Sequence, residues 1–268
     1  MPRKMTKLGQ HFLIDHYTIN MIVGYIAANS NYNLVEIGPG MGALTIPVLG
    51  LGHNITAIEL DTNIIPKLQA KSGHNDRLKI INKDALHVDF SDLPHDLGLC
   101  VFGNLPYQIS ALLMLRLGQH HGFVKKMIFM VQKEVALRLA ASPGTHEYGR
   151  LSVMVQAWCD VKIVLAVAKD CFSPPPKVES SVFMATPKVR VTTSSMDWDL
   201  FEKVVRVAFR HKRKMCYSSF KQFLTVAQWQ GLGFSATLRP SDLSVEDYIS
   251  LTKYIQNNVS LDLFSSEA

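Results

Sequence analysis

The order of apolar and amphipathic segments is the feature that most limits the fold of this chain. Seven short apolar runs have the character of β-strands, at residues 33–38, 54–60, 78–82, 97–103, 125–131, 162–168 and 180–185. Helical patterns separate most of them, at residues 42–52, 61–73, 109–121 and 132–141. Strands that alternate with helices form a mainly parallel sheet with helices on both faces, so we expect an α/β domain. The last two strands are expected to include an antiparallel edge.

The second half of the chain indicates a further, smaller domain. Strand patterns disappear near residue 193, and the rest of the chain has the pattern of helices, at residues 197–214, 216–230 and 244–258. We therefore expect an α/β domain over residues 1–192 and a helical domain over residues 193–268. Hydrophobic residues make up 47% of the chain and charged residues 19%, which is enough for a substantial core.

From the sequence we expect no membrane span, secretory signal, metal site or disulfide. No apolar run reaches the roughly 18 residues of a membrane span, and the basic N-terminus has no apolar segment of a secretory signal. The four cysteines are scattered without a CxxC pair, and the ten histidines have no ligand spacing. This pattern favours a protein of the reducing cytoplasm without a bound metal.

Three glycines and two acids lie where predicted strands end. Gly38, Gly40 and Gly42 lie in "LVEIGPGMGALT", where a ligand can approach the backbone and a helix N-terminus presents N–H groups. Glu59 is placed to accept hydrogen bonds from both hydroxyls of a ribose, and Asp84 from the amino group of an adenine. Tight packing also explains such glycines, and acids are common at solvated strand ends. Both NAD and S-adenosylmethionine (SAM) fit this pattern.

The segment "FGNLPYQIS", residues 102–110, separates these two cofactors. The exocyclic amine of adenine is a poor nucleophile because its lone pair is delocalised into the ring. We expect the Asn104 side-chain oxygen and the Leu105 carbonyl oxygen to accept hydrogen bonds from the two N–H groups of this amine. Pro106 would fix the direction of the Leu105 carbonyl. Tyr107 offers a flat face for a stacked purine, worth about 1–3 kcal/mol. A simple turn is the alternative, but together with the upstream motifs the segment indicates methylation of an amine from SAM.

Motifs along nearly the whole chain resemble one family, the KsgA/Dim-type rRNA adenine N6,N6-dimethyltransferases. They read "GQHFLID", "VEIGPGMGALT", "AIELD", "NKDAL", "GNLPYQIS", "MVQKEVALRL", "YGRLSVMVQ", "FSPPPKVESSV" and "RPSDLSVEDY". "GNLPY" and "FSPPPKV" are the most specific, and the bacterial branch acting on 16S rRNA is the most similar. The resemblance implies a Rossmann-like SAM-dependent methyltransferase domain with a mostly parallel seven-stranded sheet. It also implies that an N-terminal segment covers the cofactor and that the helical domain contacts rRNA.

The resemblance also assigns roles to particular residues. It implies a cofactor site made of His11, Leu13, Gly38, Gly40, Glu59, Asp84 and Asn104. It implies a target site made of Asn104, Leu105, Pro106, Tyr107 and Phe172, in which Phe172 faces Tyr107 across a flipped adenine. Phe172 as an ordinary core residue is the alternative. The chain departs from the family at Gln108, where Asn is common, and at "MCYSSF", which leaves the C-terminal RNA contacts open.

Positive charge is concentrated in the helical domain. The net charge is +6, and residues 201–221 hold seven Lys or Arg against one Glu. Arg206, Arg210 and Lys214 recur at helical spacing, so we expect them to form a stripe on a helix that also carries Lys212 and Arg213. Such a stripe is often only solvated surface, but beside an RNA-modifying site it favours contacts with RNA phosphates.

The function expected from the resemblance is SAM-dependent dimethylation of two adjacent adenosines in the 3′-terminal hairpin loop of 16S rRNA. The partner would be the small ribosomal subunit or its precursor, bound by a monomer with a role in subunit biogenesis. The alternatives are a ribosome-assembly factor for which methylation is secondary, and a large-subunit rRNA adenine methyltransferase. A DNA methyltransferase would need a separate recognition domain, and a dehydrogenase would leave "NLPY" unexplained.

Overall fold

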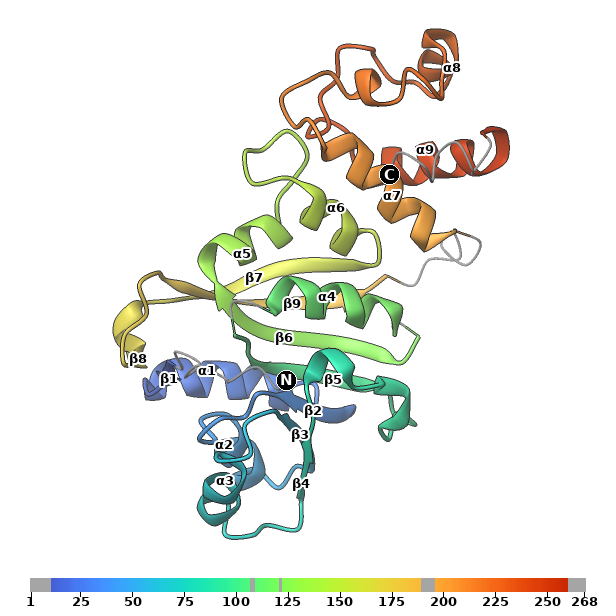
Figure 1. The fold of residues 1–268 in the computed structure, drawn as a ribbon. Coiled ribbons are helices and arrows are strands. Elements are labelled where there is room, and N and C mark those ends of the chain that lie inside the picture. Colours follow the sequence, from blue (N-terminus) through green and yellow to red (C-terminus); the bar gives the residue numbers. More distant parts are fainter. Residues whose placement is uncertain (1–10, 107–108, 121, 189–195, 260–268) are drawn as a thin grey trace, which may run out of the picture. The chain divides into compact units, whose positions relative to one another are not determined.

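A seven-stranded mixed sheet forms the centre of the N-terminal part of the protein (Figure 1). The computed structural model describes residues 11–106, 109–120, 122–188 and 196–259. The strands run in the order β4-β3-β2-β5-β6-β9-β7. The pairs from β4 to β6 are parallel, and β9 is antiparallel to β6. The fold class predicted from the alternating pattern is confirmed, although the antiparallel strand lies inside the sheet and β7 forms its edge.

All seven predicted strand segments are strands of this sheet. They are β2 (Asn33–Ile37), β3 (Ile55–Glu59), β4 (Leu78–Asn82), β5 (Leu99–Asn104), β6 (Val124–Gln132), β7 (Cys159–Val167) and β9 (Ser180–Pro187). Helix α1 (His16–Ala27) precedes β2, and α2 (Thr45–Gly50), α3 (Ile65–Lys71), α4 (Ser110–Gln119) and α5 (Lys133–Leu139) lie between strands of the sheet. Short 3₁₀ turns η1 (Ala85–His87) and η2 (Phe90–Asp92) follow β4, and η3 (Lys169–Cys171) follows β7.

Helices α1 and α2 cover the sheet through a continuous apolar core. Asp15 caps α1 by accepting a hydrogen bond from the Thr18 N–H at 2.7 Å, as Asp does at helix N-termini. One side of α1 then places Ile22 and Ile26 against the sheet, and both are almost fully buried. The same core cluster contains residues of β2, β3, β5 and β6, so these elements share one apolar layer.

A second, two-stranded sheet joins the N-terminal segment to the segment after β7. Strand β1 (Phe12–Leu13) pairs antiparallel with β8 (Phe172–Ser173), and Figure 1 shows the two strands side by side outside the main sheet. The Ile14 N–H donates to the Cys171 carbonyl at 2.8 Å and extends this contact. No strand was expected at either segment, because two residues are too few to produce a periodic pattern.

The chain divides into two compact units that do not follow the expected boundary. The first unit lies within residues 1–136 and 161–187, and the second within 137–160 and 188–268. The predicted boundary at residue 192 lies close to residues 187 and 188, where the chain passes from the first unit to the second for the last time. Residues 137–160, however, also belong to the second, helical unit. They contain α6 (Arg150–Gln156), which packs against α7 (Trp198–Phe209) and α9 (Val245–Asn258).

The helical unit has a core of helices and aromatic side chains. The Phe209 and Tyr248 rings of α7 and α9 stack with centroids 5.9 Å apart. The Ser244 hydroxyl caps α9 by accepting from the Asp247 N–H at 3.1 Å. The segment 216–230 was expected as one helix, but it forms the 3₁₀ turn η5 (Cys216–Ser219) and the short helix α8 (Val226–Gly231). Thr225 breaks the segment because it starts α8 with a capping box to Gln228.

The expected basic stripe on a long helix is wrong, because α7 ends at Phe209. Arg210 caps the helix, and its N–H bonds back to the Val207 carbonyl. Residues 210–214 then form a turn. This run contains no apolar residue, so a longer helix would bury no further surface. Met215, which directly follows this run, is 52% exposed.

Within the described residues, none of the helices is both long and apolar enough to cross a membrane.

Candidate active site

The predicted cofactor residues of the four parallel strands converge at one edge of the sheet. Gly38 follows β2, Glu59 ends β3, Asp84 follows β4 and Asn104 ends β5. Because β4, β3, β2 and β5 are parallel neighbours, their carboxyl ends lie side by side. A β-carbon built on Gly38 would lie 4.0 Å from the Asn104 carbonyl oxygen. Ligands of open α/β sheets bind at this edge, so the expected grouping of these residues is present.

Glu59 connects the glycine loop to the end of β3. Its side chain is 6% exposed. One carboxylate oxygen accepts the Gly40 N–H at 3.2 Å and the other accepts the Asp61 N–H at 2.9 Å. A carboxylate has about four acceptor positions, so each oxygen retains acceptor capacity for a ligand hydroxyl. These two bonds also fix the carboxylate in the orientation in which it meets the loop.

Asp84 lies at the start of the 3₁₀ turn η1. One carboxylate oxygen accepts the Leu86 N–H at 2.9 Å, and the other lies 3.3 Å from the His87 imidazole. The side chain is 33% exposed. Asp84 is therefore fixed by its own turn and still reaches the surface at the end of β4.

The end of β5 holds Asn104 and Leu105 between two neighbouring strands. Asn104 pairs with Met130 of β6, and the Leu105 N–H donates to the Met130 carbonyl at 3.0 Å. Leu105 is buried, whereas Pro106 is exposed. The Pro106 carbonyl accepts the Ile109 N–H at 3.2 Å, which turns the chain into α4. Tyr107 lies outside the described residues.

Gly103 sets the approach of β5 to β2 directly before this segment. Its φ is +158°, and a β-carbon there would lie 2.3 Å from the Ile37 carbonyl oxygen. Any side chain at this position would push the two strands apart at the point where Gly38 and Asn104 face each other. Gly103 was not singled out in the sequence, although its place beside "NLPY" was a usable signal.

The N-terminal segment reaches the glycine loop through a residue that was not predicted. The Phe12 ring lies 3.7 Å from the place of a β-carbon on Gly40, whose φ is +55°. His11 instead bonds through its ring nitrogen to the Pro174 carbonyl at 2.7 Å, and Leu13 is buried in the core cluster. Phe172 is 3% exposed and belongs to the same core cluster. Its role beside the target base stays a prediction.

A buried acid, Glu36, lies behind the site and was also missed. It is 2% exposed on β2, and its carboxylate accepts the Thr45 hydroxyl at 2.7 Å. Burial raises its pKa to about 8, while the Thr45 hydrogen bond lowers the pKa and the Glu59 charge raises it further. An acid inside an apolar strand segment was the signal that could have found it.

The predicted RNA residues lie in the helical unit and not in one stripe. Arg206 is exposed on α7, and Arg213 and Lys214 are exposed in the turn after it. Arg210 is the cap residue of α7. The Lys212 ammonium donates to the His146 carbonyl at 3.0 Å, so its head is held by the loop before α6.

Metal ligands are not grouped in the part of the chain that the structure describes: no three His, Cys, Asp or Glu side chains are placed to hold a metal ion. The order and direction of the strands define a Rossmann-like fold, and "NLPY" at the end of β5 places the protein in the class of SAM-dependent methyltransferases within it.

Comparison with known proteins shows to which family within this class the chain belongs. The model of the family described as ribosomal RNA adenine dimethylase matches residues 1–257. Ribosomal RNA small subunit methyltransferase A of Shewanella amazonensis is 43% identical over 250 residues, which cover 93% of this chain and 94% of the relative. The chain belongs to the ribosomal RNA adenine dimethylase family, as its motifs predicted.

Solved structures agree at the level of the fold. A dimethyladenosine transferase from Plasmodium falciparum superposes with a TM-score of 0.76 at 24% identity, covering 93% of this chain and 99% of that chain. The 23S rRNA methyltransferase ErmE superposes with a TM-score of 0.68 at 20% identity, covering 91% of this chain and 99% of that chain. At these identities the likeness concerns the fold alone.

Proposed function

We propose that this enzyme dimethylates the N6 amines of two adjacent adenosines in the loop of the 3′-terminal hairpin of 16S rRNA. The substrate would be the small ribosomal subunit or its precursor in the cytoplasm, with the protein acting as a monomer in subunit biogenesis. The single observation that carries the proposal is the convergence of Gly38, Glu59, Asp84 and Asn104 at one sheet edge, with Asn104 as the first residue of "NLPY". The name of the Shewanella relative, a small-subunit methyltransferase, supports the choice of subunit.

The residues at the sheet edge fit SAM, which supplies the methyl group when bound. Glu59 would accept hydrogen bonds from the two ribose hydroxyls, because both of its oxygens retain acceptor capacity. Asp84 would accept from the adenine amine. The loop with Gly38 and Gly40 would lie against the cofactor, with Phe12 packed on it. His11 and Leu13 would hold this N-terminal segment in place.

Asn104 and Leu105 would prepare the target amine. The Asn104 side-chain oxygen and the Leu105 carbonyl would accept hydrogen bonds from the two N–H groups of the adenine N6 amine. These bonds would draw the lone pair of the amine nitrogen out of conjugation with the ring. The Leu105 N–H is tied to Met130, which fixes the direction of the neighbouring peptide groups. After one methylation the amine keeps one N–H for one acceptor, so a second transfer needs no new group. Pro106, Tyr107 and Phe172 would form the walls of the pocket for the flipped base.

The helical unit would hold the RNA backbone. Arg206, Arg210, Lys212, Arg213 and Lys214 are the candidate contacts. Because phosphate contacts fix position without reading sequence, this unit would place the hairpin and the pocket would select the adenine. An unpaired loop base costs less to flip than a base in a duplex, which favours a hairpin loop as the target.

The experiment must distinguish this function from two others. A ribosome-assembly factor would bind the small subunit without depending on the methyl-transfer site. A large-subunit enzyme would share the fold, as the likeness to the 23S rRNA methyltransferase illustrates.

The deciding experiment measures labelled-methyl transfer from SAM to small subunits that lack adenine dimethylation, with naked 16S rRNA and large subunits as parallel substrates. We expect up to four methyl groups per small subunit, located on two adjacent adenosines. Tight binding to these subunits without transfer would support the assembly-factor alternative. Transfer to large subunits only would contradict the choice of subunit.

Asn104→Ala provides the matched variant for this assay. Removing one positioned hydrogen-bonding group from an active site costs about 10²–10³-fold in rate, so we expect a loss of this order in methyl transfer. SAM binding, measured by calorimetry, should change far less, because the main interaction of Asn104 develops with the reacting amine. Equal losses in both measurements would contradict the assignment of Asn104.

A further inference from the structure

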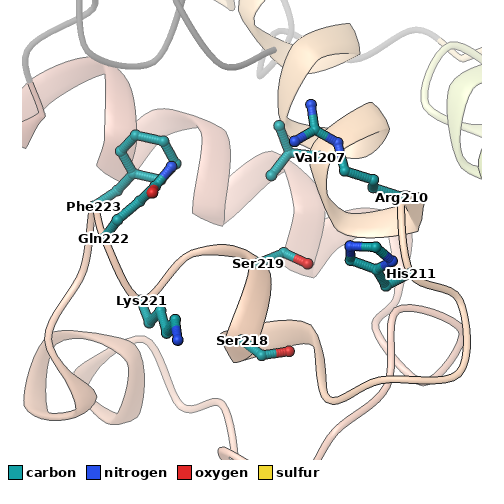
Figure 2. Close-up of a pocket in the computed structure, with 8 residues that line it drawn as sticks. All are labelled: Val207, Arg210, His211, Ser218, Ser219, Lys221, Gln222 and Phe223. Atoms are coloured by element: carbon teal, nitrogen blue, oxygen red, sulfur yellow. The ribbon is translucent and has the colours of Figure 1, made fainter.

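A polar pocket in the helical unit lies between the end of α7 and η5 (Figure 2). Its volume is about 160 Å³. It is lined by Val207, Arg210, His211, Ser218, Ser219, Lys221, Gln222 and Phe223. Six of these eight side chains carry hydrogen-bond donors, and none of the eight is acidic. The residues come from a short part of the chain that includes "MCYSSF", where the family pattern is not followed.

The early end of α7 creates this pocket. Because the helix stops at Phe209, Arg210 and His211 lie on the turn and not on a continuing helix. The chain then returns through Cys216, which is buried and donates its N–H to the Leu238 carbonyl at 2.7 Å. This contact fixes η5 opposite the helix end. Figure 2 shows the side chains of His211 and Ser219 pointing toward one another across the pocket.

The size and chemistry of the pocket select a small anion. A single buried water needs about 10–15 Å³, so this pocket offers roughly ten times that space. Pockets for drug-sized ligands start at about 300 Å³, so a whole nucleoside would not fit. A phosphate group fits this volume and needs several donors around its oxygens. Arg210 and Lys221 supply charge, and the Ser219 hydroxyl supplies a neutral donor, whereas the Ser218 hydroxyl already donates to the Met215 carbonyl.

One effect opposes an anion at this place, but it is smaller than the attraction. The carbonyl end of α7 carries a partial charge equivalent to about −0.5. Arg210 and Lys221 together carry a charge of +2, and both are exposed enough to turn toward a ligand. Arg213 and Lys214 follow in the same turn and add to the positive field. The net field at the pocket therefore favours an anion.

We infer that this pocket binds one phosphate group of the RNA backbone, with Arg210, Lys221 and Ser219 as its main donors. The inference rests on the proposed function, because that function supplies an RNA partner. It extends the RNA surface to His211, Ser219 and Lys221, which were not among the RNA contacts predicted from the sequence. A bound backbone phosphate would fix the position of the RNA on the helical unit.

The test measures equilibrium binding to small ribosomal subunits over a series of salt concentrations. Loss of one phosphate contact lowers the slope of log K against log salt by about 0.7–0.9. We expect Lys221→Ala to show this change, and Lys221→Arg to restore most of the slope. Lys67→Ala is the matched control, because Lys67 is an exposed lysine on α3 and its loss changes the net charge equally. Thermal unfolding followed by circular dichroism verifies that both units of each variant are folded.

A slope for Lys221→Ala equal to that of Lys67→Ala would overturn the inference. A second arm titrates inorganic phosphate without RNA. One outcome is that wild type binds phosphate and Lys221→Ala does not, while the salt slopes of RNA binding are equal for Lys221→Ala and Lys67→Ala. In that case the pocket takes free phosphate, and the assignment to RNA is wrong. Failure of the proposed function is distinguishable. In that case wild type would bind subunits with the Lys221-dependent slope and transfer no methyl groups.

Discussion

At the scale of single residues, a buried acid lies behind the candidate site. Glu36 lies behind the glycine loop, and burial raises its pKa to about 8. It shares this region with Glu59, whose carboxylate holds the Gly40 N–H. Two buried carboxyl groups that are both charged would repel each other in a region of low dielectric constant. A neutral Glu36 removes this repulsion behind the carboxylate that accepts the Gly40 N–H.

This arrangement predicts how stability depends on pH. An acid with a raised pKa holds its proton more tightly in the folded chain than in the unfolded chain. Between pH 4.5 and about pH 8 the folded state therefore binds more protons, and the free energy of unfolding falls as the pH rises. The slope from one such group is at most about 1.4 kcal/mol per pH unit. Glu36→Gln, which mimics the neutral acid, should remove this slope.

Urea unfolding of wild type and Glu36→Gln at pH 5, 6.5 and 8 measures this difference. Wild type should lose stability relative to the variant as the pH rises. Asp76→Asn is the control, since Asp76 is an exposed acid in the turn before β4 and its replacement should leave the pH dependence as in wild type. Parallel curves for wild type and Glu36→Gln would show that Glu36 titrates alike in the folded and unfolded chains.

At the same scale, the sequence identified the residues at strand ends but not those that support them. Gly38, Glu59 and Asp84 could be predicted because each directly follows or ends an apolar strand, and parallel strands bring such positions together. Phe12 could not, because its contact with Gly40 depends on the pairing of two-residue strands far apart in the chain. The position of Glu36 inside an apolar strand could have marked it in the sequence, but its raised pKa follows from a burial that only the structure shows.

At the scale of elements, the strands followed the sequence better than the helices did. Each strand of the main sheet is a run of apolar residues that the helices cover, so composition and length were enough to find it. Helix ends depend on where burial stops. The pattern of α7 continued through Lys214, but the last apolar contact is that of Phe209 with Tyr248, and the helix ends at Phe209. Arg206 lies on α7 as expected, whereas Arg210, Lys212, Arg213 and Lys214 follow the end of the helix.

The junction of β2 and β5 gives a prediction at this scale. Gly103→Ala would place a β-carbon 2.3 Å from the Ile37 carbonyl oxygen, so the strands must separate. We expect a loss of stability of about 1–3 kcal/mol, as for other overpacked sites, and weaker SAM binding because Gly38 and Asn104 end these two strands. Denaturant unfolding and calorimetry measure the two effects.

Gly24→Ala is the matched control for this substitution. Gly24 lies inside α1, and a β-carbon there would meet no atom within 4 Å. Alanine is favoured over glycine inside a helix by about 0.5–1 kcal/mol, so this variant should be more stable with unchanged SAM binding. If Gly103→Ala behaved like Gly24→Ala, the close approach of β5 to β2 would not matter for the site.

At the scale of the whole molecule, the two compact units divide cofactor binding from RNA binding in the proposed function. The residues that would hold SAM are in the first unit, and the exposed cations Arg213 and Lys214 are in the second. Replacing both cations with Ala should lower the salt slope of small-subunit binding by about 1.4–1.8, as two phosphate contacts require. SAM affinity should stay the same, because neither cation belongs to the sheet edge.

The double variant Lys67→Ala/Lys79→Ala separates this effect from a general loss of charge. Both lysines are exposed in the first unit, and their removal changes the net charge by the same amount. A general electrostatic attraction would make the two double variants alike, whereas a local RNA surface would lower the slope only for Arg213 and Lys214. A fall in SAM affinity for the Arg213 and Lys214 variant would mean that the two units are coupled, because substitutions in the helical unit would then alter binding at the sheet edge of the first unit.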